Sequence, residues 1–208
     1  MSAAKTNSVA VAILAKAPVP GTAKTRLIPL IGAHAAAVLQ ERMIERTVET
    51  AMAADIGPLT LWCAPDIAHA SFQDLAARFP LVLKQQPDGD LGARMLRAIA
   101  AGDGPTLLIG TDCLAFTAEI LHAAAKALDD ADVVLIPAED GGYVLIGACA
   151  VYPELFSGIA WGGAAVMQET RARIAALGLK AVELEPLWDV DTEADLTRFE
   201  AMYPEMAL

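Results

Sequence analysis

The sequence has few cysteines and few histidines, which argues against several kinds of site. The three cysteines are far apart and form no C-x-x-C pair: Cys63, Cys113 and Cys149. We therefore expect neither a disulfide framework nor a thiolate metal site. The three histidines fall in segments with helical patterns and in no recognisable nucleophile motif: His34, His69 and His122. Catalysis by a cysteine that a histidine activates is therefore not favoured.

Basic residues and long apolar runs are also scarce. Lys and Arg number 15 against 26 Asp and Glu, which gives a formal net charge of −11. A chain with this charge does not attract nucleic acid or anionic lipid over a broad surface. An anionic substrate must therefore bind at a local cluster of cations. Charge or proline interrupts the apolar runs before the ~20 residues that a spanning helix needs, and the run 9–15 is too short for an export signal. We expect no membrane span and a cytoplasmic location.

The 208 residues, 55% of them hydrophobic, are enough for one domain over 1–208 with a substantial core. Short apolar runs alternate with Ala-rich helical stretches, which is typical of βαβ units. We expect strands at 9–16, 59–64, 81–85, 106–110, 132–137, 143–148 and 180–184, and helices at 33–54, 67–79, 91–101, 117–128, 164–177 and 192–202. The turn at 140–143 would make one edge of the sheet antiparallel. The predicted fold class is α/β, a Rossmann-like three-layer α/β/α sandwich with a mostly parallel central sheet.

The densest cationic cluster follows the first strand, in the segment AKAPVPGTAKTRL. Open α/β sheets bind ligands beyond the carboxyl ends of their strands, which is where this segment lies. Lys16, Lys24 and Arg26 could bind a polyphosphate, and the backbone around Gly21 could approach it closely. Ala23 stands where a Walker A loop needs glycine, so this is not such a loop. The alternative is a Pro-stiffened loop with solvated cations.

A second polar segment, QQPDGDLGARM, joins a strand to a helix. Its amides and glycines could receive a nucleobase, because an amide can pair with a base edge and glycine permits close backbone approach. The candidate substrate-binding residues are Gln85, Gly89, Asp90 and Arg94. The alternative is a polar turn in which Asp88 or Asp90 caps the helix.

Two further segments place carboxylates where a metal ion could bind. Asp112 follows the apolar strand 106–110, and beside the first segment it would suit Mg²⁺ or Mn²⁺, which prefer oxygen ligands. Asp189 and Asp191 alternate in an extended segment, so both could face one cation. The alternatives are that Asp112 caps the next helix and that Asp191 favours the N-terminus of the last helix, where Thr192 and Asp195 form a capping pattern.

The segment EDGGY, residues 139–143, combines two acids with two glycines between apolar strands. Asp140, Gly141 and Gly142 could form a turn that binds a sugar or an acceptor, with Asp140 orienting the acceptor or acting as a base. Turn chemistry alone is the alternative.

Together these motifs resemble the GT-A-type nucleotide-diphospho-sugar transferase superfamily, and more narrowly a family of small bacterial GT-A-like glycosyltransferases associated with arsenosugar biosynthesis. The resemblance rests on five segments in order: AKAPVPGTAKTRL, QQPDGDLGARM, LLIGTDC, PAEDGGYVLIG and WDVDTEADL. It implies that Lys24 and Arg26 hold phosphates, that Gln85 and Gly89 lie near the base, and that Asp112 and Asp191 hold the cation.

The chain departs from this family on the expected acceptor side. Leu114 replaces a proline after Thr111-Asp112-Cys113, which would loosen the turn beside the metal, and Gly162-Gly163 replaces a hydroxyl residue after Trp161, itself a candidate substrate-binding residue. The leading prediction is a metal-dependent glycosyltransferase with a nucleoside diphospho-sugar donor and a small-molecule acceptor. The alternatives are a nucleotidyltransferase that releases pyrophosphate and a nucleotide-binding protein without turnover.

Overall fold

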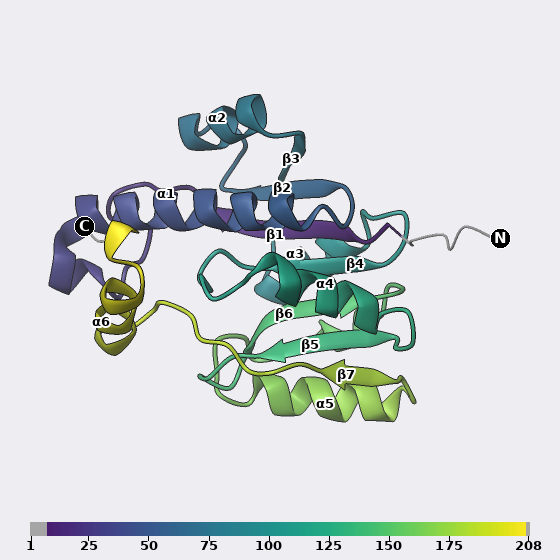
Figure 1. The fold of residues 1–208 in the computed structure, drawn as a ribbon. Coiled ribbons are helices and arrows are strands. Elements are labelled where there is room, and N and C mark those ends of the chain that lie inside the picture. Colours follow the sequence, from purple (N-terminus) through teal and green to yellow (C-terminus); the bar gives the residue numbers. More distant parts are fainter. Residues whose placement is uncertain (1–7, 207–208) are drawn as a thin grey trace.

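The computed structural model describes residues 8–206 and contains one seven-stranded sheet (Figure 1). The strands are β1 (Ala10–Lys16), β2 (Leu59–Ala64), β3 (Leu81–Gln85), β4 (Thr106–Ile109), β5 (Val133–Pro137), β6 (Tyr143–Ala148) and β7 (Ala181–Glu183). The helices are α1 (Ile28–Ala54), α2 (Ala70–Arg78), α3 (Leu91–Ile99), α4 (Ala118–Ala127), α5 (Val166–Ala176) and α6 (Glu193–Met202). The predicted α/β class with a mostly parallel sheet is confirmed. The predicted single domain and the interpretation of the N-terminus extend over residues 1–7 and 207–208, which lie outside the described residues.

The order of the sheet, β3-β2-β1-β4-β6-β5-β7, differs from the prediction at one strand. β6 runs antiparallel to both β4 and β5, whereas β1 to β4 pair in parallel and β7 is parallel to β5. The reversed strand therefore lies inside the sheet, and the expectation of an antiparallel edge was wrong. A tight turn fixes the β5–β6 hairpin, but it does not set which strand pairs with the other side of β6.

Helices cover both faces of the sheet. Buried apolar side chains of α1, α2 and α4 pack on one face, and those of α3 and α5 pack on the other. Figure 1 shows α1 and α4 lying along the sheet on the same side. The order of layers is the predicted α/β/α sandwich, which buries parallel strands on both sides. Within residues 8–206, no helix is long and apolar enough to cross a membrane.

A third apolar cluster joins three distant parts of the chain at one end of the sheet. Leu27 and Leu39 come from the start of the molecule, Leu114 from the segment after β4, and Trp188 and Phe199 from the C-terminal segment. In Figure 1, α6 lies beside the N-terminal end of α1. The cluster therefore brings together the segments that carry Lys24, Asp112 and Asp191.

The starts of two helices differ from the sequence prediction by three or more residues, for local reasons. α1 begins at Ile28, whereas the sequence predicts a start at 33. The backbone is not helical at Gly32, where φ is +80°, so a short turn of helix precedes the predicted part. α2 begins at Ala70, and His69 caps it by accepting a hydrogen bond on Nδ1 from the Ser71 N–H, so the expectation that His69 lies inside a helix was wrong. Thr192 caps α6 in a capping box with Asp195, as the sequence predicts.

Candidate functional site

A cavity of about 940 Å³ opens at the carboxyl ends of β1 and β4, beside the start of β6. It is lined by parts of the loop after β1, the start of α3, the segment after β4, the β5–β6 turn, the loop before α5 and the C-terminal segment. Nine of the predicted site residues line it: Lys16, Lys24, Arg26, Arg94, Asp112, Asp140, Gly142, Trp161 and Asp191. The other five lie outside the lining: Gly21, Gln85, Gly89, Asp90 and Gly141.

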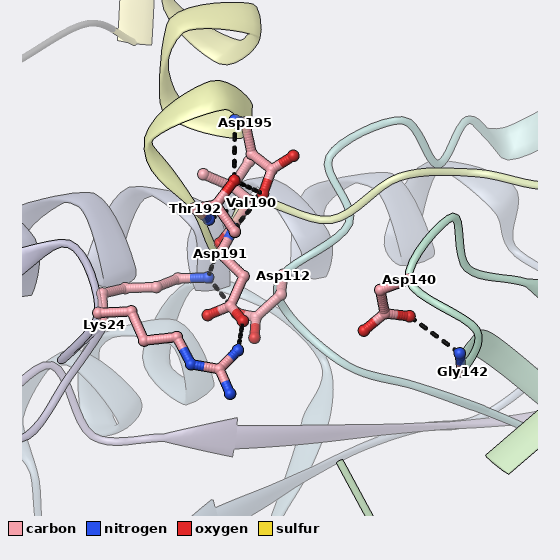
Figure 2. Close-up of polar contacts among 9 residues, drawn as sticks. Lys24, Asp112, Asp140, Gly142, Val190, Asp191, Thr192 and Asp195 are labelled. Carbon is pink, nitrogen blue, oxygen red and sulfur yellow. Dashed lines mark hydrogen bonds and ion pairs between the residues drawn. The ribbon is translucent and has the colours of Figure 1, made fainter. Parts of the chain in front are cut away.

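The cations of the loop after β1 are all engaged with the protein. Lys24 Nζ donates to Asp112 Oδ1 at 2.6 Å and to the Val190 carbonyl at 2.7 Å. Arg26 forms an ion pair with Asp191. Figure 2 shows the carboxylates of Asp112 and Asp191 close to each other and beside Lys24. Lys16 Nζ donates to the Thr22 carbonyl at 2.7 Å, which closes the loop on itself. β1 and β4 are paired neighbours, so the predicted proximity of this loop to Asp112 is confirmed.

Lys24 is an unusual residue in both burial and conformation. Its side chain is 3% exposed, whereas that of Asp112 is 50% exposed. Its φ is +47°, in the left-handed region that costs a residue with a Cβ about 1 kcal/mol or more. Strained backbone of this kind gathers at functional sites, where the surrounding contacts hold it in place. Gly21, with φ of +85°, provides a second left-handed position in the same loop.

Four carboxylates line the cavity: Asp112, Asp140, Asp189 and Asp191. Burial, followed by the negative charges of Asp140, Asp112 and Asp191, raises the pKa of Asp189 to about 6. The sequence pattern makes both Asp189 and Asp191 possible ligands of one cation and does not distinguish the two. Alternation along the chain does not reveal which carboxylate is the more buried. Carboxylates with strongly raised pKa values gather at functional sites.

The donor set fits a divalent cation that is shared with a ligand. Among residues 8–206, no group of three or more His, Cys, Asp or Glu side chains is placed to hold a metal ion. Mg²⁺ commonly takes one or two protein carboxylates and completes its shell with phosphate oxygens and water. Asp112 and Asp191 can supply two such carboxylates. In this structure, ion pairs with Lys24 and Arg26 balance their negative charges. Asp112 and Asp191 are therefore the residues that could hold a divalent cation.

The β5–β6 turn holds Asp140 at the opposite side of the cavity. Its Oδ1 accepts a hydrogen bond from the Gly142 N–H at 2.9 Å, and Figure 2 shows its carboxylate turned toward Asp112 and Asp191. Gly141 has φ of +95°, and a Cβ there would lie 2.4 Å from the Ala164 carbonyl oxygen. The turn thus needs glycine at 141 to pack against the segment before α5.

In the second polar segment, the side chain that lines the cavity is that of Gln86 and not that of the predicted Gln85. Gln85 points away and donates to the Pro65 carbonyl at 2.9 Å, whereas Gln86 lines the cavity and donates to the Ala15 and Trp62 carbonyls. Successive residues of a strand face opposite sides, so an error of one residue moves the side chain out of the site. Asp90 caps α3 by accepting from the Ala93 N–H at 2.8 Å, the helix-capping alternative considered above.

The turn after Asp112 lacks the family's proline but makes several contacts with the rest of the protein. Leu114 is buried in the third apolar cluster, and its carbonyl accepts a hydrogen bond from the Tyr203 hydroxyl at 3.0 Å. The Asp112 carbonyl accepts from the Val190 N–H at 2.9 Å. These contacts hold the turn without proline.

Cys113 also lines the cavity, and burial raises its pKa to about 12, which disfavours its thiolate.

Comparison with known proteins places the chain in a family. Residues 47–163 match the family described as uncharacterized proteins conserved in bacteria (DUF2064). A candidate nucleotide-diphospho-sugar transferase from Desulfovibrio desulfuricans G20 has 30% sequence identity and a TM-score of 0.84, with 94% of this chain and 87% of that chain covered. No curated protein matches the chain significantly.

More distant solved structures share the fold. A nucleotidyl transferase from Methanothermobacter thermautotroptrophicus has 16% identity and a TM-score of 0.67, with 96% of this chain and 99% of that chain covered. The inositol-1-phosphate CTP transferase from T. maritima has 12% identity and a TM-score of 0.61, with 96% of each chain covered. The chain thus has the fold of nucleotide-diphospho-sugar transferases and belongs to the DUF2064 family of bacterial proteins.

Proposed function

We propose that the protein is a transferase that moves a sugar from a nucleoside diphospho-sugar to a small-molecule acceptor, with Mg²⁺ or Mn²⁺ as cofactor. The observation that carries this proposal is the pairing of loop cations with Asp112 and Asp191 inside one large cavity. A volume of about 940 Å³ lies within the range of about 300–1,000 Å³ that is typical of small-ligand sites. The likeness to the Desulfovibrio protein supports the choice of donor.

The residues of the loop after β1 would bind the diphosphate. Lys24 and Arg26 would exchange their carboxylate partners for phosphate oxygens, and Lys16 would add a third positive charge. Asp112 and Asp191, once released, would hold the divalent cation. When bound, that cation supplies positive charge opposite the leaving diphosphate. Lys24 and Arg26 would stabilise the same developing charge, because they are fixed before the reaction begins.

Asp140 would orient the acceptor and take the proton from its hydroxyl group. The Gly142 N–H holds one carboxylate oxygen, and the carboxylate faces the cavity. A general base must lie within hydrogen-bond reach of the proton that it accepts. We therefore expect Asp140→Asn to lose turnover while it keeps nucleotide binding. The nucleobase would lie beside the segment that joins β3 to α3, close to Gly89, where Gln86 rather than Gln85 is the amide that lines the cavity.

Nucleotidyl transfer is the second candidate, because three cations suit a triphosphate at least as well as a diphosphate. A phosphorylated acceptor would then attack the α-phosphate, and pyrophosphate would leave. The association with arsenosugar biosynthesis stays a prediction of the sequence resemblance, as does the cytoplasmic location.

A thermal-shift panel tests these functions. UDP-, GDP-, ADP-, CDP- and dTDP-sugars would be compared with the matching triphosphates, each with and without Mg²⁺ or Mn²⁺. A ligand at about 100 times its Kd stabilises the native state by about 2.7 kcal/mol. A metal-dependent shift with one diphospho-sugar that Lys24→Met abolishes supports the first function. A shift with triphosphates alone favours nucleotidyl transfer. A shift that no metal affects, together with no turnover of any ligand, favours a binding protein.

A further inference from the structure

Arg94, on α3, is the cavity cation that lacks a partner. Four cations line the cavity, and three of them, Lys16, Lys24 and Arg26, bond to the protein. Within residues 8–206, the Arg94 guanidinium has no hydrogen-bond or ion-pair partner, although its Nε atom is buried. This occurs in a chain with a net charge of −11 and beside a cavity with four Asp side chains.

Leaving a guanidinium donor buried and unpaired is costly, since it has lost water without gaining another acceptor. A planar guanidinium presents a fork of donors that matches the oxygens of a carboxylate or phosphate. Within the part of the chain that the structure describes, the terminal nitrogens of Arg94 are also unpaired but remain accessible, so we expect their partner to be a bound anion rather than a group of the protein.

A second buried and unpaired donor lies against the first turn of α3. Trp161 Nε1 is also buried without a hydrogen-bond partner. The Trp161 ring meets the edge of Tyr143 at 6.4 Å between centroids, and both residues line the cavity. A Cβ at Gly92 would lie 2.7 Å from Trp161 Nε1, so glycine at 92 lets α3 approach this indole closely. The first turns of α3 thus bring Arg94 and Trp161 to one wall.

This wall is separate from the loop after β1. That loop leads into α1, which packs on one face of the sheet, whereas α3 packs on the other face together with Trp161. We assign the loop cations to the phosphates of a nucleotide, which leaves Arg94 for a different charged group.

We propose that Arg94 and Trp161 form an anion subsite that binds the carboxylate or phosphate group of the second substrate, the acceptor. This assignment rests on the proposed function only in naming that ligand as the acceptor. It restricts acceptors to small molecules that carry a negative group as well as the hydroxyl that reacts.

The indole N–H signals of ¹⁵N-labelled protein offer a direct test. The protein has three tryptophans, and Trp161→Phe identifies the signal of Trp161. The probes are glycerol 3-phosphate, glycerate and neutral glycerol. We expect the Trp161 signal to shift saturably with at least one of the two anions and not with glycerol, and the two anions distinguish a phosphate from a carboxylate preference.

Arg94→Gln is the test variant, and Arg97→Gln is its matched control, because Arg97 lies on the same helix but is exposed and outside the cavity lining. Loss of one or more charge-assisted hydrogen bonds should weaken anion binding about tenfold or more in Arg94→Gln. Arg97→Gln should bind as the unchanged protein does. Equal binding by Arg94→Gln, an equal response to glycerol or no saturable shift at all would overturn the subsite.

The nucleotide panel separates this subsite from the proposed function. If Arg94→Gln loses nucleotide binding as severely as Lys24→Met does, Arg94 belongs to the nucleotide site and the proposal is wrong. If no nucleotide binds but the Trp161 shift still depends on Arg94, the anion subsite stands and the proposed transferase does not.

Discussion

Asp112→Ala and Lys24→Met should destabilise the protein to very different extents, although they break the same ion pair. Lys24 is 3% exposed and Asp112 is 50% exposed. Removing Asp112 leaves a buried ammonium whose remaining partner is the Val190 carbonyl. Removing one partner of a buried pair costs about 3–5 kcal/mol, and the retained carbonyl places this case near 3 kcal/mol.

Lys24→Met should cost about 1–2 kcal/mol, because the Val190 carbonyl loses its donor, whereas the half-exposed Asp112 regains water and Met retains most of the buried volume. Arg26→Met is the control, since the Arg26–Asp191 pair is exposed and such pairs contribute about 0–1 kcal/mol. The double variant Lys24→Met/Asp112→Ala should be more stable than Asp112→Ala alone, because the unpaired ammonium is gone.

Urea unfolding followed by circular dichroism measures these differences. With a slope of about 2 kcal/mol per M, the midpoint should fall by about 1.5 M for Asp112→Ala and by about 0.5–1 M for Lys24→Met. If Lys24→Met lost as much stability as Asp112→Ala, or if the double variant were the less stable, the asymmetry of burial would not control this pair.

Three further predictions concern the supporting structure. Gly141→Ala should lower the unfolding free energy by about 2 kcal/mol or more, because it forces a Cβ onto the Ala164 carbonyl at positive φ, whereas Gly104→Ala, with open space around it, should change stability by less than about 0.5 kcal/mol in the same urea titration. Thr192→Ala should cost about 1 kcal/mol through loss of the α6 cap, and a cost near zero would contradict the capping box. Burial, followed by the charge of Asp66, raises the pKa of Cys63 from 9.0 to about 12, so the native state keeps a proton that the unfolded chain releases above pH 9. The unfolding free energy should therefore fall between pH 9 and 12, and comparison with Cys63→Ala at pH 8 and pH 10.5 should show a smaller fall in the variant.

Most of the fold could be predicted from the sequence because its signals are local. Continuous apolar runs such as that of β4 mark buried strands, and turn residues such as Asp140 and Gly141 mark the hairpin after β5. No local signal in the sequence reveals that β6 lies between β4 and β5. This position depends on which edge of β5 remains free to pair with β7. The kink at Gly32 was also hidden, because one glycine does not reveal its own φ.

The proximity of some candidate residues could be predicted, and the details of their arrangement were missed for a similar reason. Position beyond a strand end correctly indicated that Lys24 and Asp112 lie together. The choice between Gln85 and Gln86 depends on the strand register, and the burial of Asp189 depends on charges from three other segments. The missing partner of Arg94 is a property of the assembled cavity, and no spacing in the chain could show it.

The contacts of Lys24 also bear on how the protein is made. This side chain bonds to Asp112 and Val190, and the cluster beneath it is completed by Phe199 in α6. Protein synthesis adds about 5–20 residues per second, so the loop after β1 exists for roughly ten seconds or more before its last partners are added. During that time its cations have no C-terminal segment to bind. Under the proposed function, capture of a nucleotide must therefore wait until nearly the whole chain has been synthesised, and a chain that stops before α6 would carry the loop without the site.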